Sequence, residues 1–175
     1  IIDEIRTITS DDSLFQLEYK NTNIIIKGGQ CTLIPASFFS LQTADIFSKV
    51  NFGNTENKIL KANYIKKHIN TVNLFIIDKY LEERLIRLFP NSKRFHVTTP
   101  MIYYGLNHFI PKSKGEVYLE FEKNRFWAVV IKEQKLLLSN RFRFSNEEEM
   151  DYHILNIYKQ FEFKQEVNPL IISGS

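Results

Sequence analysis

The chain has 175 residues, of which 43% are hydrophobic and 14% aromatic, and its formal net charge is +3. This composition supplies one substantial core or two small ones, so it excludes a disordered or fibrous protein. The small net charge does not indicate nucleic acid as a partner, because domains that bind it usually gather their basic residues into one strong patch.

No segment of the sequence predicts insertion into a membrane. The longest apolar runs, such as Phe126 to Ile131, are far shorter than the roughly 20 residues that cross a bilayer, and no charged and then apolar leader opens the chain. The single cysteine, Cys31, excludes an internal disulfide and a cysteine-rich metal cluster. We therefore expect a cytoplasmic protein. The chain starts at Ile1 rather than Met and stops just after an apolar strand, so we expect both ends to be truncated.

The first part of the chain alternates predicted strands and helices. A short helical stretch precedes the sequence NIIIKGGQCTLIP, which predicts two extended runs joined at Gly28-Gly29, a dipeptide that tolerates the positive φ of a tight turn. Apolar spacing predicts a helix over Ala36 to Val50. Two further strands are expected around Ile59 to Ile65 and Thr71 to Ile77.

The next segment carries clear helix boundaries. Asp78 is a good N-cap for a helix that Pro90 ends. The sequence SKRFHVTT predicts a short strand. Thr99 followed by Pro100 predicts the start of a helix that runs to about Phe109 and is terminated at Pro111.

The last part of the chain has the most regular pattern. Val117, Leu119 and Phe121 alternate with polar residues, which is typical of a half-buried strand. A strand that is apolar on both faces follows, and then a third strand over Lys135 to Phe144. The segment Ser145-Asn146-Glu147-Glu148 predicts a capping box that opens an amphipathic helix. With the strand Leu170-Ile171-Ile172, the predicted order is strand, strand, strand, helix, strand.

This order resembles half of the ribonuclease-H-like fold on which actin, sugar kinases and the pilus-assembly actin-like proteins are built. More closely, the chain resembles a family of uncharacterised bacterial proteins with an actin-like ATPase fold. The matching marks are Thr32-Leu33-Ile34-Pro35 with Phe38, Val72-Asn73-Leu74-Phe75, Phe89-Pro90, Leu137-x-x-Asn140-x-Phe142 and Ile172-Ser173-Gly174.

The resemblance implies an α/β protein with mixed sheets that consists of two ribonuclease-H-like halves. Residues 1–112 would form the first actin-like half, without its N-terminal hairpin. Residues 113–175 would form the second half, without its C-terminal helices.

The resemblance also implies where nucleotide would bind in a relative with an intact site. A phosphate-binding hairpin would need an acidic residue near Glu120 and a small residue near Glu122, with Asn124 and Arg125 completing the turn. The segment with Ser173 and Gly174 is similar to the strand that enters the adenosine loop.

The residues of this turn are acidic or long, so we expect a retained fold that has lost its hydrolytic site. A carboxylate 4 Å from a phosphate costs about 4 kcal/mol at an effective dielectric constant of 20. Glu122 also replaces a glycine that would adopt positive φ without strain. A solvated hairpin tip explains the same residues. A residual phosphate contact from Arg125 stays open, and ATP with Mg²⁺ is possible but not favoured.

Other candidate sites are weaker. His68, His96, His108 and His153 are scattered and have no ligand spacing, so we expect no metal site. Cys31 has no nearby base, which favours a buried small hydrophobe over a nucleophile. A solvated face explains the basic run Lys58, Lys61, Lys66, Lys67 and His68. Trp127 is expected to belong to a core. Glu120 and Asp151 are a weak candidate for a pair of catalytic carboxylates.

The only positive indication of function is aromatic surface at Phe52, Tyr64, Tyr103 and Tyr104, since exposed aromatic residues are enriched in protein interfaces. The favoured hypothesis is a non-catalytic actin-like domain that binds a protein partner or itself. The alternatives are a nucleotide-binding ATPase whose first phosphate loop precedes Ile1, and a nucleic-acid-binding domain on the ribonuclease-H-like frame.

Overall fold

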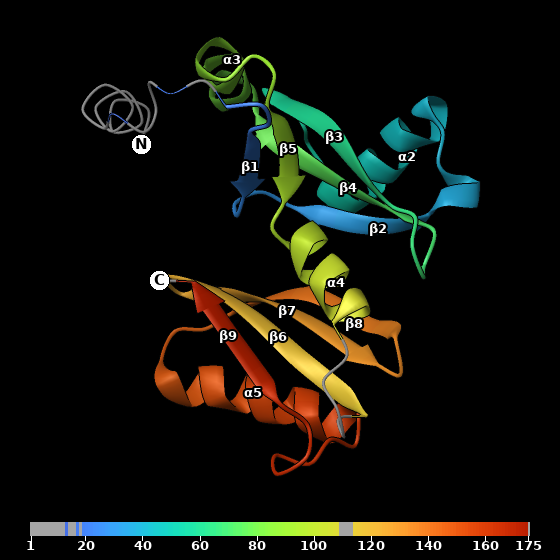
Figure 1. The fold of residues 1–175 in the computed structure, drawn as a ribbon, viewed down its shortest axis with the longest axis vertical. Helices are drawn as coiled ribbons and strands as arrows, with labels where there is room; N and C mark the ends of the chain where they lie inside the picture. Colours follow the sequence, from blue (N-terminus) through green and yellow to red (C-terminus); the bar gives the residue numbers. More distant parts are fainter. Residues whose placement is uncertain (1–12, 14–16, 18, 109–113, 175) are drawn as a thin grey trace.

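The structure is a computed structural model that describes residues 13, 17, 19–108 and 114–174. Figure 1 shows an upper and a lower lobe, with the helix labelled α4 between them. We call β1 to β5 with their helices the first lobe and β6 to β9 with α5 the second. The predicted N-terminal helical stretch, Pro111 and the predicted division at residue 112 lie outside the described residues.

The first lobe contains two small sheets. β1 (Asn23–Ile26) and β5 (Lys93–His96) pair in parallel. The other sheet is antiparallel and has the order β2-β4-β3. Its strands are β2 (Cys31–Pro35), β3 (Lys58–Ile65) and β4 (Thr71–Asp78). The helices are η2 (Ala36–Phe38), α2 (Leu41–Phe52) and α3 (Lys79–Leu88).

The antiparallel sheet is inserted in the sequence between β1 and β5, which pair with each other. β1 leads into β2, and the chain returns to β1 only after α3, when β5 pairs with it. At the other edge of β5, a side chain makes the hydrogen bonds that a further strand would make. Asn63 donates to the Arg94 carbonyl (2.9 Å) and accepts the His96 N–H (3.0 Å). The backbone groups of this buried edge are therefore satisfied, as buried polar groups must be.

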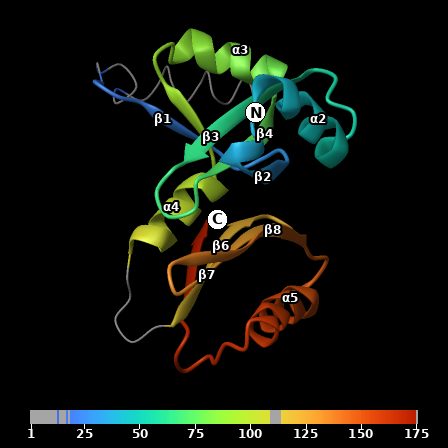
Figure 2. The ribbon, with the colours of Figure 1, turned by 90° about the vertical axis from the view of Figure 1, so that its right-hand side faces the viewer.

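The second lobe has the element order expected from the sequence. Its sheet runs β8-β7-β6-β9, with β9 parallel to β6 and the other pairs antiparallel. The elements are β6 (Gly115–Glu122), β7 (Arg125–Lys132), β8 (Lys135–Arg143), α5 (Glu147–Gln160) and β9 (Leu170–Gly174). In both views α5 covers the face of this sheet that points away from the first lobe (Figures 1 and 2).

The central strand β7 is buried on both faces, as its apolar run predicts. Phe126 and Ala128 pack with Ile157 of α5. On the opposite face, the sheet packs against α4 (Thr98–Asn107), which lies between the lobes. The residues of this cluster are Ile65, Ile102, Leu106, Tyr118, Val129 and Ile131. The two lobes therefore share apolar packing across α4.

The start of α3 agrees with the sequence prediction. Asp78 accepts the N–H groups of Tyr80 and Leu81, as predicted. α4 starts one residue before the predicted cap and has no side-chain cap. The reason is that Asn73 donates to the hydroxyls of Thr98 and Thr99, at 2.8 and 2.9 Å, so both threonines serve a buried polar cluster instead.

Three further boundaries differ from the sequence prediction. The helix expected over Ala36 to Val50 is divided into η2 and α2, because Ser40 caps α2 by accepting the Thr43 N–H. α4 ends at Asn107 rather than at Phe109. In α5 the cap is Asn146, whose side chain accepts the Glu149 N–H at 2.8 Å, and Ser145 instead donates its backbone N–H to Glu149.

Candidate functional site

The parallel strands of both lobes direct their carboxyl ends toward one junction. The arrow of β1 points toward the second lobe and that of β9 toward the first (Figure 1). Ligands of open α/β sheets bind at the carboxyl ends of such strands. The junction contains the turn Lys27-Gly28-Gly29 after β1, the end of β6 and the end of β9. It is therefore the place to look for a functional site.

A salt bridge crosses the junction between the lobes. Lys27 Nζ lies 2.5 Å from Glu120 Oε1. The second carboxylate oxygen of Glu120 accepts the hydroxyl of Ser173 on β9. The carboxylate is buried, with 7% of the residue exposed, so its charge is compensated as a buried charge requires. Both oxygens of the predicted acidic residue thus have partners within the protein.

At the hairpin tip between β6 and β7, the charged side chains Glu122 and Arg125 pair with each other. Arg125 donates to Glu122 through Nε (2.9 Å) and Nη2 (2.7 Å). This bidentate pair lowers the pKa of Glu122 below its usual value. Asn124 is exposed at the tip and accepts the Phe144 N–H through its carbonyl. The positive φ of this turn falls on Lys123, at 47°, rather than on Glu122.

The backbone conformation at the end of β9 requires a glycine, Gly174. Its φ is 106°, and an added Cβ would overlap the backbone of Phe121. This left-handed backbone beside a neighbouring strand favours glycine. The structure thus brings Ser173 to Glu120 and sets Gly174 beside Phe121 in the sheet. An adenosine-binding role for the two residues stays a prediction.

Two residues of the second lobe hold the turn after β1. Trp127 donates its indole N–H to the Lys27 carbonyl (3.1 Å), and Arg141 donates through Nη1 to the Gly29 carbonyl (2.6 Å). The Arg141 guanidinium lies over the Trp127 ring, 5.2 Å from its centroid. Trp127 is buried, as predicted. Lys27 and Arg141 were not found from the sequence, because nothing local connects either residue to the hairpin.

A neutral histidine lies behind Trp127. His96, at the end of β5, is fully buried and its ring is perpendicular to the Trp127 ring at 4.7 Å. Burial lowers its pKa to about 3. Its Nδ1 is 2.8 Å from the Thr98 hydroxyl, while Nε2 has no hydrogen-bond partner among the described residues. His96 is thus a buried imidazole at the end of a strand.

Cys31 lies on the other side of Thr98. Its Sγ is 3.6 Å from the Thr98 hydroxyl, and burial raises the pKa of the thiol to about 11. Because the thiolate is the nucleophile, such a thiol is unreactive near neutral pH. The side chain is half-buried rather than buried and packs at the edge of an apolar cluster, so the expectation of a small buried hydrophobe is right only in part.

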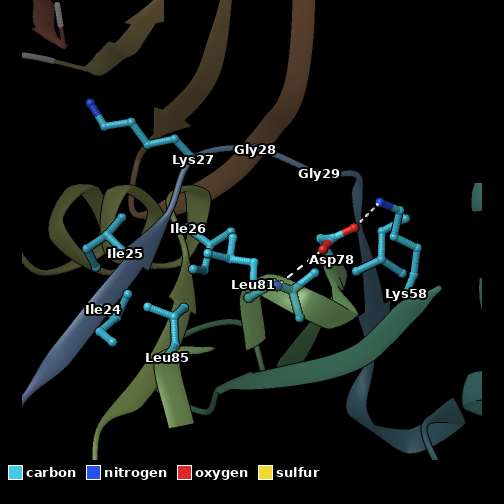
Figure 3. A pocket seen from close by; sticks show the side chains of 12 residues that line it. Ile24, Ile25, Ile26, Lys27, Gly28, Gly29, Lys58, Asp78, Leu81 and Leu85 are labelled. Carbon is cyan, nitrogen blue, oxygen red and sulfur yellow. Dashed lines mark hydrogen bonds and ion pairs between the residues drawn. The ribbon is translucent and has the colours of Figure 1, made fainter. Parts of the chain in front are cut away.

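Two apolar cavities flank Lys27. The first, about 410 Å³, lies between β1 and α3, and Figure 3 shows Ile24, Ile26, Leu81 and Leu85 around it. The charges drawn at its rim include Lys58 and Asp78, which pair with each other at 3.1 Å. The second, about 380 Å³, lies between β1, α4 and the β6 and β9 strands. Their walls supply apolar contact but few groups for chemistry.

The remaining predicted candidates do not assemble into sites. Among the residues that the structure describes, no three histidine, cysteine, aspartate or glutamate side chains are grouped as metal ligands. Asp151 lies exposed on α5, which covers the face opposite Glu120, so this pair is not brought together. Lys61 bonds Glu82 at 2.6 Å and Lys67 bonds Asn107 at 2.6 Å, so the basic run is divided among separate partners.

The aromatic prediction was right for three residues and wrong for one. Tyr64, Tyr103 and Tyr104 are about half exposed. Phe52 is buried, because it follows Ala44 and Ser48 at helical spacing on the face of α2 that packs on β4. No described helix is long and apolar enough to span a membrane.

Comparisons with known proteins identify the family and the fold. Residues 1–175 match the family described as Protein of unknown function (DUF3822), so the chain belongs to it. A crystal structure from Bacteroides thetaiotaomicron, of a protein with an actin-like ATPase fold and unknown function, is 27% identical and has a TM-score of 0.84. The match covers 99% of this chain and 67% of that one. The chain therefore has an actin-like ATPase fold.

A second solved structure is more distant. The PilM-PilN type IV pilus biogenesis complex is 8% identical over 93% of this chain and 52% of the other, with a TM-score of 0.41. No curated protein sequence matches the chain.

Proposed function

We propose that this actin-like domain does not hydrolyse nucleotide and acts by binding a protein partner or a second copy of itself. The observation that carries the proposal is the Lys27 to Glu120 salt bridge across the junction. A triphosphate in this place would need free cations and backbone donors. The cation at the centre of the junction is instead neutralised by a buried carboxylate.

The hairpin supports the same function. Arg125 is the one side chain of the turn Glu122-Lys123-Asn124-Arg125 that could fork onto a phosphate, and both of its hydrogen bonds go to Glu122. Releasing Arg125 would expose the Glu122 carboxylate to the phosphate. Repulsion between two unit charges at 4 Å is about 4 kcal/mol at an effective dielectric constant of 20. The pairing of Arg125 and the negative charge of Glu122 thus both oppose phosphate binding at this hairpin.

Exposed apolar side chains on the first lobe support a protein partner. Phe38 is 65% exposed, Leu41 87% and Tyr64 57%. Phe39 makes an edge-to-face contact with Tyr64, with ring centroids 5.7 Å apart, so the start of α2 and β3 are joined on this surface. Ile46 and Val50 are exposed further along α2. Large apolar side chains left exposed in this way are enriched in interaction sites.

Thermal unfolding with and without Mg-ATP tests the proposal. A ligand that binds only the folded state raises the unfolding midpoint. Since we propose that Mg-ATP does not bind, we expect no rise in the midpoint at millimolar Mg-ATP. A rise that disappears in Arg125→Ala, together with phosphate release, would establish a nucleotide-binding ATPase instead. Lys123→Ala, at the same turn, is the matched control. A salt-dependent shift of oligonucleotides in a gel would favour the nucleic-acid-binding alternative.

A further inference from the structure

Three arginines are gathered on two neighbouring strands beside the junction. Arg125 on β7 is the register partner of Arg143 on β8, and Arg141 is the register partner of Trp127. Like charges directly opposite each other on a sheet are destabilising. Burial, and then the charges of Arg125 and Arg143, lower the pKa of Arg141. The fold therefore keeps an electrostatically costly cluster at this place.

Arg141 is fixed in position but has donors to spare. It lies over Trp127, and one hydrogen bond to the Gly29 carbonyl holds it there. A guanidinium has five N–H donors. No other acceptor for the Arg141 guanidinium is found among the described residues. Glu122, whose charge acts on Arg141, is itself held by Arg125.

A small polar pocket opens beside this guanidinium. Its volume is about 190 Å³, and its walls come from β2, α2, β7 and β8. The polar lining residues are Gln30, Asn51, Asn140 and Arg141, and none of the described residues in its wall is acidic. Asn140 uses its side-chain oxygen to accept the Arg141 backbone N–H. Its amide N–H₂, like that of Gln30, has no acceptor among the described residues. Asn51 donates to the Phe47 carbonyl at 2.8 Å, so the open donors of the pocket come from Arg141, Asn140 and Gln30.

We propose that this pocket, formed by Arg141, Asn140, Gln30 and Asn51, receives a carboxylate side chain from an acidic segment of a partner protein. A fixed guanidinium with neighbouring amide donors matches the planar, two-oxygen acceptor of Asp or Glu. Charge complementarity supports the assignment, because Lys123 in the β6–β7 turn and Arg143 opposite Arg125 are exposed and would attract further acidic residues.

The size of the pocket selects a side chain over a free metabolite. Pockets for small molecules usually hold about 300–1,000 Å³, and this one holds about 190 Å³. It admits one carboxylate head group but not a nucleotide. The inference rests on the proposed function, since it names the partner chemistry of a protein-binding domain.

Tryptophan fluorescence measures binding at this site directly, because Trp127 is the only tryptophan of the chain and lines the pocket. The probe is acetylated, amidated hexaglutamate, with hexaglutamine as the neutral comparison. We expect a saturable change of emission with hexaglutamate alone. Arg141→Gln should weaken binding by about tenfold or more, as expected for a lost bidentate pair.

Asn140→Asp is the sharper variant because aspartate has nearly the same shape as asparagine. Aspartate keeps the acceptor for the Arg141 N–H but replaces the open donor with a negative charge, so hexaglutamate binding should be abolished. Asn156→Asp makes the same charge change on the exposed side of α5 and should leave binding within about twofold.

Each other outcome overturns the inference. Absence of a hexaglutamate signal at millimolar peptide excludes the site. Equal effects of Asn140→Asp and Asn156→Asp would indicate general charge attraction. Binding of inorganic phosphate or Mg-ATP with the same dependence on Asn140 would assign the pocket to phosphate. A chain that binds neither hexaglutamate nor Mg-ATP overturns this inference alone, whereas an Arg125-dependent Mg-ATP response overturns the proposed function.

Discussion

The indole N–H of Trp127 reaches the carbonyl oxygen of Lys27 across 3.1 Å, and the two residues are 100 positions apart in the chain. The side chain of Lys27 meets Glu120 in the same place. One residue of the first lobe therefore contacts the second through both its backbone and its side chain. The junction is held by specific polar contacts in addition to the apolar packing around α4.

Replacing Trp127 with Phe tests how much this contact contributes. Phenylalanine keeps an aromatic ring in the core but removes the donor and reduces the surface under Arg141. We expect the free energy of unfolding to fall by about 2 kcal/mol, the usual cost of a lost hydrogen bond plus reduced packing. Urea unfolding followed by circular dichroism measures it. Tyr152→Phe, at an exposed aromatic residue, is the control and should be neutral; a neutral Trp127→Phe would show that the junction does not depend on this bond.

His96 predicts a loss of stability in mild acid. Its pKa is about 3 in the folded protein, against about 6.5 in an unfolded chain. Below pH 6.5 the unfolded chain binds a proton that the folded protein does not, so stability is full above this pH and falls progressively toward pH 3. Between pH 7 and pH 5 this histidine should account for about 2 kcal/mol.

Urea unfolding of the protein and of His96→Gln at both pH values isolates this contribution. The difference between pH 7 and pH 5 should shrink by about 2 kcal/mol in the variant, whatever the variant does to stability at pH 7. If His96→Gln retains the full pH dependence, the buried imidazole is not its source.

The second lobe could be predicted from the sequence because each of its strands carries its own pattern. Alternation marks β6, although the strand is buried on both faces rather than half-buried, because Tyr118 and Glu120 lie between the lobes. A continuous apolar run marks β7, and the acidic first turn marks α5, whose cap is Asn146. The pairing of β1 with β5 could not be predicted. Both strands have four residues, and one edge of β5 is satisfied by the side chain of Asn63 rather than by a strand.

Only part of the candidate site could be predicted, because some of its contacts join residues that are far apart in the sequence. Glu120 and Glu122 could be placed by their position on one hairpin. Their partners differ in kind: Arg125 is three residues from Glu122, whereas Lys27 reaches Glu120 only through the tertiary fold. Phe52 was a different error, because its helical spacing from Ala44 and Ser48 was present in the sequence and indicated a buried face.

The turn after β1 predicts opposite outcomes for two adjacent glycines. Gly29 has φ 93°, and an added Cβ would lie 2.5 Å from the Ile76 carbonyl oxygen. Gly28 has no heavy atom within 4 Å of an added Cβ. Gly29→Ala should therefore lower the free energy of unfolding by about 2 kcal/mol or more. Gly28→Ala should change it by less than about 0.5 kcal/mol. Thermal and urea unfolding of the two variants side by side measure the contrast; equal effects would mean that the turn has another conformation.

A buried ion pair in the first lobe gives the largest expected loss. Glu82 is 2% exposed and bonds both Lys61, at 2.6 Å, and Arg94, at 3.2 Å. Glu82→Gln leaves the buried Arg94 guanidinium without a counter-charge, so the free energy of unfolding should fall by about 3 kcal/mol. The exposed pair of Lys58 with Asp78 is the control.

Removing the charge of an exposed pair costs little, because water screens both partners. Lys58→Gln should therefore cost less than about 1 kcal/mol in the same urea titration. The comparison sets a buried carboxylate with two cationic partners against an exposed pair with one partner. A Glu82→Gln loss as small as that of Lys58→Gln would mean that water reaches Arg94 in solution and that the interface between α3 and β5 is less tightly packed than the structure has it.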